Sequence, residues 1–253
     1  MSTLKQILDK NDWSGTDSNL TTDKASTHNY IDGFYEEAFL PLKNKEIKIL
    51  EIGIAGGASL LLWDEYFKNN TGVYGIDVNS NAYRDEVNNR DRINAIVGNA
   101  YDLNLVDNLP VFDIIIDDGP HSLESMVSSI QLYLPKLNSK GIMVIEDIQS
   151  VDWLVTLTDV FNQNKTEIDE FEVVDLRETI GRYDDLMFII RRKWIIVIVN
   201  QEIGYVGRLA NQMFQYASLV GVATKNGFDY GIPFENAKRS KKTGASHGDE
   251  EKL

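Results

Sequence analysis

The sequence predicts a doubly wound α/β fold. Its sheet should be mostly parallel with an antiparallel last strand, and an extra strand-loop-helix unit should follow at the C-terminus. Short runs rich in Ile and Val alternate with helix-like stretches, which is the pattern of βαβ units. Within these runs polar and apolar residues hardly alternate, as strands buried on both faces require. A short polar loop joins the last two runs of the sheet, which permits an antiparallel pair.

The sheet domain is expected over residues 46–192, after a helical lead-in over residues 1–45. In the lead-in, residues 31–40 place apolar side chains at helical spacing and should form a helix that stops before Pro41. Strands are expected at residues 47–52, 73–77, 93–97, 112–117, 141–146, 171–176 and 186–191. Helices are expected at residues 58–69 and 123–137.

The composition changes again after Lys193. A strand over residues 194–199, a glycine-containing loop over 204–208 and a helix over 209–225 predict a separate unit spanning residues 193–236. Residues 237–253 are polar and are expected to form a disordered tail.

Charge and composition exclude several classes of function. A formal net charge of −14 disfavours nucleic acids and anionic membranes as partners, because binding phosphate requires a basic surface. The chain has no cysteines, which excludes disulfides, thiolate metal sites and a cysteine nucleophile. Neither a signal peptide nor an apolar run long enough to span a bilayer is visible. We therefore expect a cytoplasmic protein without membrane insertion.

A glycine-containing segment over residues 51–59 follows the first expected strand and opens a helix. Glycines let the backbone turn sharply and let a ligand approach it closely. The second strand ends in Asp77, where an acid can accept hydrogen bonds from ribose hydroxyls. These features suit a dinucleotide and an adenosyl cofactor equally well, and ordinary tight turns are the structural alternative.

Three details favour S-adenosylmethionine over a dinucleotide. Ala55 stands where the second glycine of a G-x-G-x-x-G motif would be. Glu51 could form a hydrogen bond near a cationic sulfonium amino acid but would repel a pyrophosphate. A polar residue after the third strand, Asn99, can read an adenine edge. The expected cofactor-binding residues are Glu51, Gly53, Ala55, Gly56, Ser59, Asp77, Asn99, Ala100 and Asp117.

Acidic residues and one histidine follow two strands that should be neighbours in the sheet. Asp118 and His121 come just after residues 112–117, and Glu146 and Asp147 end the next strand. An all-oxygen set suits a hard cation, so Asp118, Glu146 and Asp147 are expected to bind Mg²⁺. His121 is expected to take a proton from an acceptor hydroxyl, which then attacks the methyl group. The alternatives are a helix cap, a structural histidine and solvated loop acids.

The residues just described resemble the metal-dependent sugar O-methyltransferases of macrolide biosynthesis, the macrocin and mycinamicin enzymes. The resemblance covers roughly residues 20–192 and rests on segments 51–59, 74–77, 116–121, 144–149 and 182–185, together with the lead-in residues Thr22, Asp23, Lys24, His28, Tyr30, Tyr35, Glu36 and Phe39. It implies a Rossmann-like methyltransferase sheet and Mg²⁺-dependent methyl transfer to a sugar hydroxyl. By this match the metal ligands would be Asp118, Glu146 and Asp147, and the base would be His121. The chain departs from the family at Pro120, where a small polar residue is usual.

A second resemblance lies in the C-terminal unit. Residues 207–217 resemble the opening motif of the α-1,2-fucosyltransferase family, with Ala210 in place of a glycine. This implies the start of a glycosyltransferase domain, and a helix that merely packs on the sheet domain is the alternative. The two resemblances together point towards glycan modification.

The leading hypothesis is an S-adenosylmethionine-dependent O-methyltransferase acting on a sugar or glycan. The alternatives are a non-catalytic adenosyl-binding module attached to a glycosyltransferase and an NAD-linked enzyme of sugar-nucleotide metabolism. The expected partner is a small-molecule or glycan acceptor, and the sequence leaves a homo-oligomer open.

Overall fold

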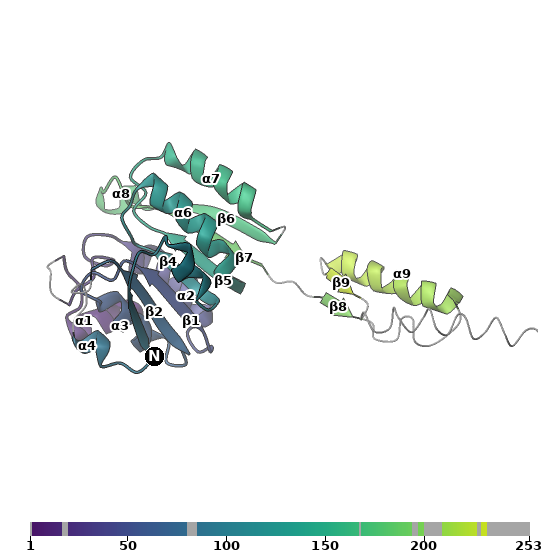
Figure 1. The fold of residues 1–253 in the computed structure, drawn as a ribbon, viewed down its shortest axis with the longest axis horizontal. Coiled ribbons are helices and arrows are strands. Elements are labelled where there is room, and N and C mark those ends of the chain that lie inside the picture. The colour runs from purple at the N-terminus through teal and green to yellow at the C-terminus, as the bar shows by residue number, and fades with distance from the viewer. Residues whose placement is uncertain are drawn as a thin grey trace, which may run out of the picture. The chain divides into compact units, whose positions relative to one another are not determined.

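The computed structural model describes residues 2–16, 20–79, 85–166, 168–193, 197–199, 209–226 and 229–231. The chain divides into two compact units, Met1–Lys193 and Trp194–Leu253. The first unit contains the sheet domain and its lead-in (Figure 1).

A seven-stranded sheet forms the centre of the first unit, with the strand order β3-β2-β1-β4-β5-β7-β6. Its strands are β1 (Lys48–Ile52), β2 (Gly72–Asp77), β3 (Ile93–Val97), β4 (Phe112–Asp117), β5 (Leu137–Ile145), β6 (Asp169–Asp175) and β7 (Leu186–Arg192). The strands from β1 to β5 pair in parallel, whereas β7 runs antiparallel to both β5 and β6. The predicted doubly wound sheet with a reversed last strand is confirmed.

The register aligns the carboxyl ends of the central strands. Ile52 at the end of β1 pairs with Asp117 of β4, which in turn pairs with Ile145 of β5. The ladder extends past the strand ends, because the amide of Asp118 donates to Ile52 at 3.0 Å and that of Glu146 donates to Asp117 at 3.0 Å. The segments that follow β1, β4 and β5 therefore leave the sheet at the same edge.

Helices cover both faces of the sheet (Figure 1). They are α1 (Leu4–Asn11), α2 (Glu36–Phe39), α3 (Ala58–Tyr66), α4 (Asp85–Asn88), α5 (Leu103–Asp107), α6 (Leu123–Tyr133), α7 (Trp153–Asn164) and α8 (Arg177–Ile180). One hydrophobic core contains residues of helices α1, α2, α3 and α4 together with Ile114 and Ile116 of β4. The other contains residues of α5, α6 and α7 together with Ile115 of β4. Consecutive strand residues point to opposite faces, so a run without polar residues can fill both cores.

Several helix boundaries differ from the predictions. The helix expected to stop before Pro41 consists of a π-helical turn (Ile31–Tyr35), α2 and a 3₁₀ turn (Leu40–Leu42) that includes Pro41. Proline is tolerated there because the first residues of a helical turn need no amide donor. The helix predicted over 58–69 ends at Tyr66, and the one predicted over 123–137 gives way at Leu134 to a 3₁₀ turn before β5.

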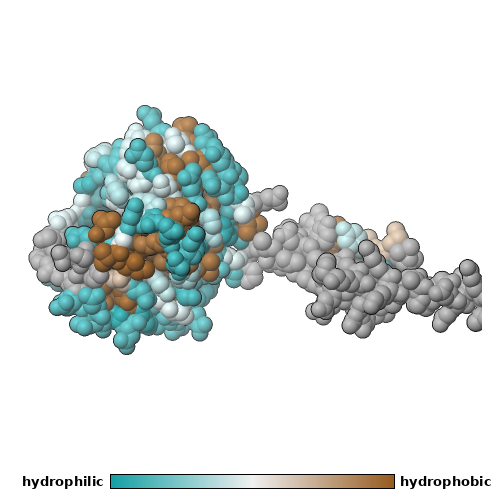
Figure 2. All heavy atoms as spheres, in the orientation of Figure 1, coloured by the Kyte–Doolittle hydropathy of each residue, from teal (hydrophilic) through white to brown (hydrophobic). Residues whose placement is uncertain are grey.

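Five helices of the first unit were not predicted: α1, α4, α5, α7 and α8. The signal for α1 is present in the sequence, because Thr3 and Gln6 form a reciprocal capping box. On the face drawn in Figure 2, this unit is mostly hydrophilic with a band of hydrophobic residues across its middle.

The second unit contains β8 (Val197–Val199), α9 (Leu209–Asn226) and β9 (Asp229–Gly231). β8 and β9 pair in parallel, which makes a β-α-β arrangement. The predicted strand and helix are present, and β9 was not predicted. The predicted loop at 204–208 and tail at 237–253 lie outside the described residues. Among the helices that the structure describes, none is long and apolar enough to cross a lipid bilayer.

Candidate active site

A cavity of about 600 Å³ opens at the carboxyl edge of the central strands. Residues that follow β1, β2, β3, β4 and β5 line it, together with residues 15–16 and 21–23 of the lead-in. Its volume lies within the usual range for small-molecule sites. Nine predicted site residues line the cavity: Gly53, Ala55, Ser59, Asp77, Asn99, Ala100, Asp118, His121 and Asp147.

The loop after β1 adopts a conformation that requires glycine. Gly53 has a φ of 89° and Gly57, which precedes α3, has a φ of 88°. A Cβ atom on Gly53 would lie 2.1 Å from the backbone oxygen of Asp118. Ala55 also has a positive φ, 44°, which is uncommon for a residue with a side chain. This loop therefore packs tightly against the end of β4 and exposes backbone to the cavity.

Asp77 connects the end of β2 to this loop. Its Oδ2 accepts hydrogen bonds from the amides of Ile54 at 2.9 Å and Ala55 at 3.3 Å, and its Oδ1 accepts one from Asn79 at 2.8 Å. A carboxylate has about four lone-pair sites, so these bonds leave capacity to accept hydroxyl groups from the cavity. Asp77 thus occupies the position predicted for a ribose-binding acid.

Four predicted site residues, Glu51, Gly56, Asp117 and Glu146, are not among those that line the cavity. Glu51 is buried, accepts a hydrogen bond from the indole of Trp63 at 3.0 Å, and burial raises its pKa. Its contact with the cofactor stays a prediction, and in this structure its carboxylate faces the protein interior.

Asp117 lies behind the cavity wall. It is buried, which raises its pKa to about 6, and it accepts a hydrogen bond at 3.3 Å from the hydroxyl of Tyr101. Tyr101 itself lines the cavity, although it was not predicted as a site residue. In this structure Asp117 is therefore connected to the cavity through its hydrogen bond with Tyr101.

Two of the three predicted metal ligands flank the predicted base. Nε2 of His121 lies 3.7 Å from Oδ1 of Asp118 and 3.6 Å from Oδ2 of Asp147. One ligand atom from each residue lies within 4.8 Å of the others, a spacing that suits a shared cation. His121 and Asp147 have φ values of 54° and 55°, and such backbone strain is often found at functional sites.

Lys24 is a second site residue, besides Tyr101, that the sequence reasoning missed. It is buried, and its Nζ lies 2.6 Å from Oδ2 of Asp118, contacts Glu146 and lies 3.4 Å from Oε1 of Glu51. Burial alone would lower the pKa of Lys24, but the surrounding carboxylates outweigh burial and hold the pKa well above its usual value. Its signal was the lead-in motif Thr22-Asp23-Lys24, which carried no assigned role.

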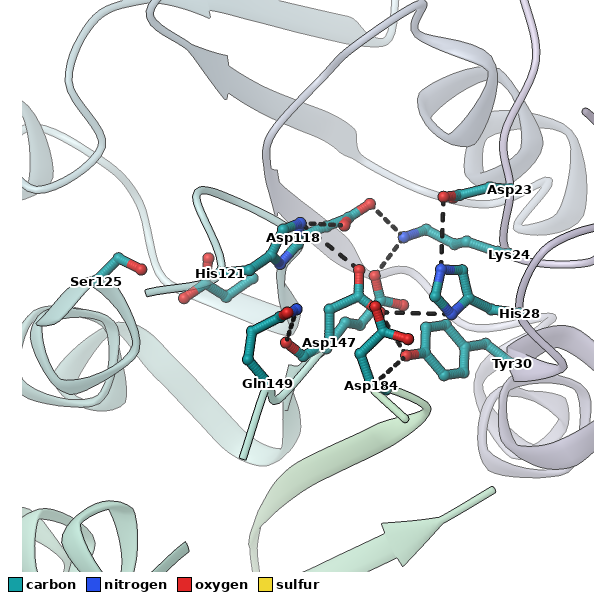
Figure 3. Close-up of polar contacts among 12 residues, drawn as sticks. Asp23, Lys24, His28, Tyr30, Asp118, His121, Ser125, Asp147, Gln149 and Asp184 are labelled. Carbon is teal, nitrogen blue, oxygen red and sulfur yellow. Dashed lines mark hydrogen bonds and ion pairs between the residues drawn. The ribbon is translucent and has the colours of Figure 1, made fainter. Parts of the chain in front are cut away.

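Other lead-in residues also bind the acids. The hydroxyl of Tyr35 donates to Glu146, and that of Tyr30 donates to Oδ1 of Asp147 at 2.5 Å. Burial raises the pKa of both tyrosines, so both remain hydrogen-bond donors. In Figure 3, Asp118 and Asp147 lie between His121 on one side and the lead-in residues on the other.

The donor set fits a hard cation in part. Asp118 and Asp147 each direct one oxygen towards His121, and oxygen ligands suit Mg²⁺. Glu146 is engaged by Lys24 and Tyr35 instead. His28, Asp184 and Asp185 form a second cluster at suitable spacing. These side chains already have partners within the protein, because His28 contacts Asp185 at 2.5 Å and Asp184 pairs with Arg182.

Residues 50–148 match the family model of a methyltransferase domain. The chain is 33% identical over 143 residues to the 8-demethyl-8-alpha-L-rhamnosyl tetracenomycin-C 2'-O-methyltransferase of Streptomyces olivaceus, covering 52% of this chain and 36% of the relative. It is 31% identical over 147 residues to the demethylmacrocin O-methyltransferase of Streptomyces fradiae, covering 54% and 36%. The matched region thus spans about a third of the length of these relatives.

Solved structures agree on the fold. The MycE methyltransferase of the mycinamycin biosynthetic pathway, determined with Mg and S-adenosylhomocysteine, matches with a TM-score of 0.58 at 20% identity, over 76% of this chain and 55% of MycE. An O-methyltransferase from Bacillus cereus matches with a TM-score of 0.52 at 14% identity, over 75% and 89%. The match to a methyltransferase-domain model is thus confined to residues 50–148, and the first unit has the Rossmann-like α/β fold of these solved structures.

Proposed function

We propose that this protein is an S-adenosylmethionine-dependent O-methyltransferase that transfers a methyl group to a hydroxyl of a sugar or glycan, assisted by Mg²⁺. The observation that carries the proposal is the meeting of His121, Asp118 and Asp147 on the wall of the cavity that the glycine loop also lines. A base, two cation-binding carboxylates and a nucleotide-type loop at one sheet edge are the parts that such a transfer needs.

The cofactor would be held by backbone and side-chain groups at the ends of three strands. Gly53, Ala55 and Ser59 would hold its amino-acid end, and Asp77 would accept hydrogen bonds from the ribose. Asn99 and Ala100 would contact the adenine. When bound, S-adenosylmethionine supplies an electrophilic methyl group, and Mg²⁺ supplies charge that lowers the pKa of a hydroxyl.

The chain's own residues would move the proton and align the acceptor. Nε2 of His121 would accept the proton of the acceptor hydroxyl, because an imidazole nitrogen can act as a general base and His121 lines the cavity. Asp118 and Asp147 would hold the cation, with Glu146 as the predicted third ligand. The main contribution of the site is alignment of the hydroxyl with the methyl group.

A sugar acceptor is supported by the lead-in side of the cavity. Thr16, Thr21, Thr22 and Asp23 line the cavity there, and hydroxyl and carboxylate side chains suit a ligand that carries many hydroxyls. The relatives named above include enzymes that act on rhamnosyl and macrocin compounds. We therefore infer a glycosyl or sugar hydroxyl as the acceptor.

For the second unit we propose the opening β-α-β segment of a glycosyltransferase-like domain. The resemblance of residues 207–217 to a fucosyltransferase motif and the parallel pairing of β8 with β9 support this proposal. An experimental structure of this unit in which β8 and β9 do not pair in parallel would contradict the proposal.

Methyl transfer is tested with labelled S-adenosylmethionine and a panel of rhamnosylated and other glycosylated acceptors. We expect product with at least one of them, and EDTA should abolish turnover until Mg²⁺ is restored. Calorimetry should detect binding of S-adenosylmethionine and S-adenosylhomocysteine but not of NAD. Binding of NAD alone would contradict the proposal, and unchanged turnover in EDTA would remove the metal from it.

A further inference from the structure

Lys24 reaches the acid cluster from the side opposite His121 (Figure 3). Its side chain is 1% exposed, and three carboxylates surround its ammonium group. Two of them, Asp118 and Glu146, directly follow the adjacent strands β4 and β5. A lysine this deeply buried is rare unless it is paired.

The hydrogen bonds of Lys24 use oxygens that a divalent cation would need. Oδ2 of Asp118 accepts from Lys24 at 2.6 Å, and Oε2 of Glu146 also accepts from Lys24. The other oxygen of Glu146 accepts from Tyr35. Both oxygens of Glu146 are therefore engaged within the protein, while Asp118 retains one oxygen that faces His121.

We propose that Lys24 is an internal counter-ion of the active site, whose ammonium competes with a divalent cation for the carboxylates of Asp118 and Glu146. This inference rests on the proposed function, in which these acids belong to a metal-assisted site. The ammonium neutralises the buried acids before a cation binds, and it limits how tightly the cation is held once it does.

A counter-ion of this kind has two effects of opposite sign. Removing its charge leaves the buried carboxylates of Glu51 and Glu146 without a positively charged partner, which destabilises the cation-free protein. The same change frees oxygens of Asp118 and Glu146 and removes a positive charge near the cation, which should tighten cation binding. If Lys24 had only a structural role, its removal would lower both the stability of the protein and its affinity for the cation.

The test compares wild type with Lys24→Met by thermal unfolding and by calorimetric titration with Mg²⁺, both in the presence of S-adenosylhomocysteine and without acceptor. Without Mg²⁺ we expect the Tm of Lys24→Met to fall by about 5 °C or more. Its Kd for Mg²⁺ should fall at least about tenfold. Saturating Mg²⁺ should therefore raise its Tm more than that of wild type.

Lys43→Met is the matched control. Lys43 is also buried, but it lies over the ring of Tyr66 at 4.0 Å and donates to the backbone of Ser2, outside the acid cluster. This variant should lose stability and keep the Mg²⁺ affinity of wild type. If it gained the same Mg²⁺ affinity as Lys24→Met, the gain would not come from the acid cluster and the inference would be overturned.

Lys24→Met/Glu51→Gln keeps the inference testable if the single variant does not fold. It removes one positive and one negative charge together, and Glu51 is not a predicted metal ligand. We expect it to fold and to bind Mg²⁺ more tightly than wild type. Mg²⁺ affinity that is unchanged or weaker in this variant overturns the inference. Binding of S-adenosylhomocysteine by wild type and by Lys43→Met in parallel titrations would leave the proposed methyl transfer standing.

Discussion

A Cβ atom on Gly53 would lie 2.1 Å from the backbone oxygen of Asp118, so the cofactor loop and the acid-bearing end of β4 are in direct backbone contact. This close approach brings together the loop that would hold the cofactor and the segment that carries Asp118, which would hold the cation. Only glycine allows this approach, since any side chain would push the two segments apart.

Gly53→Ala should therefore destabilise the protein by about 2–4 kcal/mol, because it adds a steric clash to a strained positive φ. Urea unfolding measures this loss. Gly181→Ala is the control, since Gly181 has a similar φ of 83° but no atom within 4 Å of an added Cβ. The control should lose only about 1 kcal/mol. Equal losses of stability in the two variants would show that the clash between the added Cβ and Asp118 does not destabilise the protein.

His121→Gln should lower turnover by a factor of about 10² to 10⁴, which is the usual contribution of a general base. Affinity for S-adenosylmethionine should change little, because the imidazole lies beside Asp118 and Asp147 and is not one of the predicted cofactor-binding groups. Steady-state kinetics and calorimetry measure the two quantities. Turnover that survives the substitution would assign the proton to another group.

Asp77→Asn should weaken the binding of S-adenosylhomocysteine by a factor of about 10 to 100, because hydrogen bonds to a charged group are the stronger ones. The amide also cannot accept at both positions from Ile54, Ala55 and Asn79. Asp113→Asn makes the same chemical change where Asp113 accepts from Lys48 and Asn138. Calorimetry should show no loss of affinity in that control.

The ion pair between Asp169 and Arg192 should make stability depend on pH. Burial alone would raise the pKa of Asp169, but hydrogen bonds from Arg192 and Thr166 hold it below its usual value. A pKa that is lower in the folded state adds stability above the unfolded value of about 3.9, and this stability is lost as the pH falls through the folded pKa.

Wild type should therefore lose more stability than Asp169→Asn between about pH 5 and pH 3, and Asp169→Asn should cost about 1–3 kcal/mol at pH 7. Denaturant unfolding across this range is the measurement. Asp175→Asn is the control, because its pair with Arg177 is exposed and should contribute less than about 1 kcal/mol. Parallel pH profiles for wild type and Asp169→Asn would contradict this account.

The strands could be predicted because their signal is local. The apolar runs at Ile93–Val97 and Phe112–Asp117 have the same bounds in the sequence and in the structure. The helix α7 was missed although its signal is local. Its apolar residues Trp153, Leu154, Leu157, Val160 and Phe161 recur at helical spacing and pack in one core. The capping box of α1 shows that a local signal can also be overlooked.

The composition of the site could be predicted, but the direction of its side chains could not. Asp117 and Asp118 are consecutive acids, yet Asp117 is buried against Tyr101 and Asp118 lines the cavity. Of the consecutive acids Glu146 and Asp147, Asp147 lines the cavity and Glu146 does not, and the positive φ of Asp147 turns the backbone at that point. The pleat and the strand-end turn decide which neighbour faces a ligand, and no residue type encodes that choice.

The sequence by itself determined the strands of the sheet, the helices that follow β1 and β4, and the sheet edge that carries the acids, because the signals for these features lie in neighbouring residues. Only the tertiary structure decided that Lys24 meets Asp118 and Glu146, which are 94 and 122 positions away. Such a pairing depends on how the lead-in packs beside the sheet, and its stability comes from burying charges that no short segment could bring together.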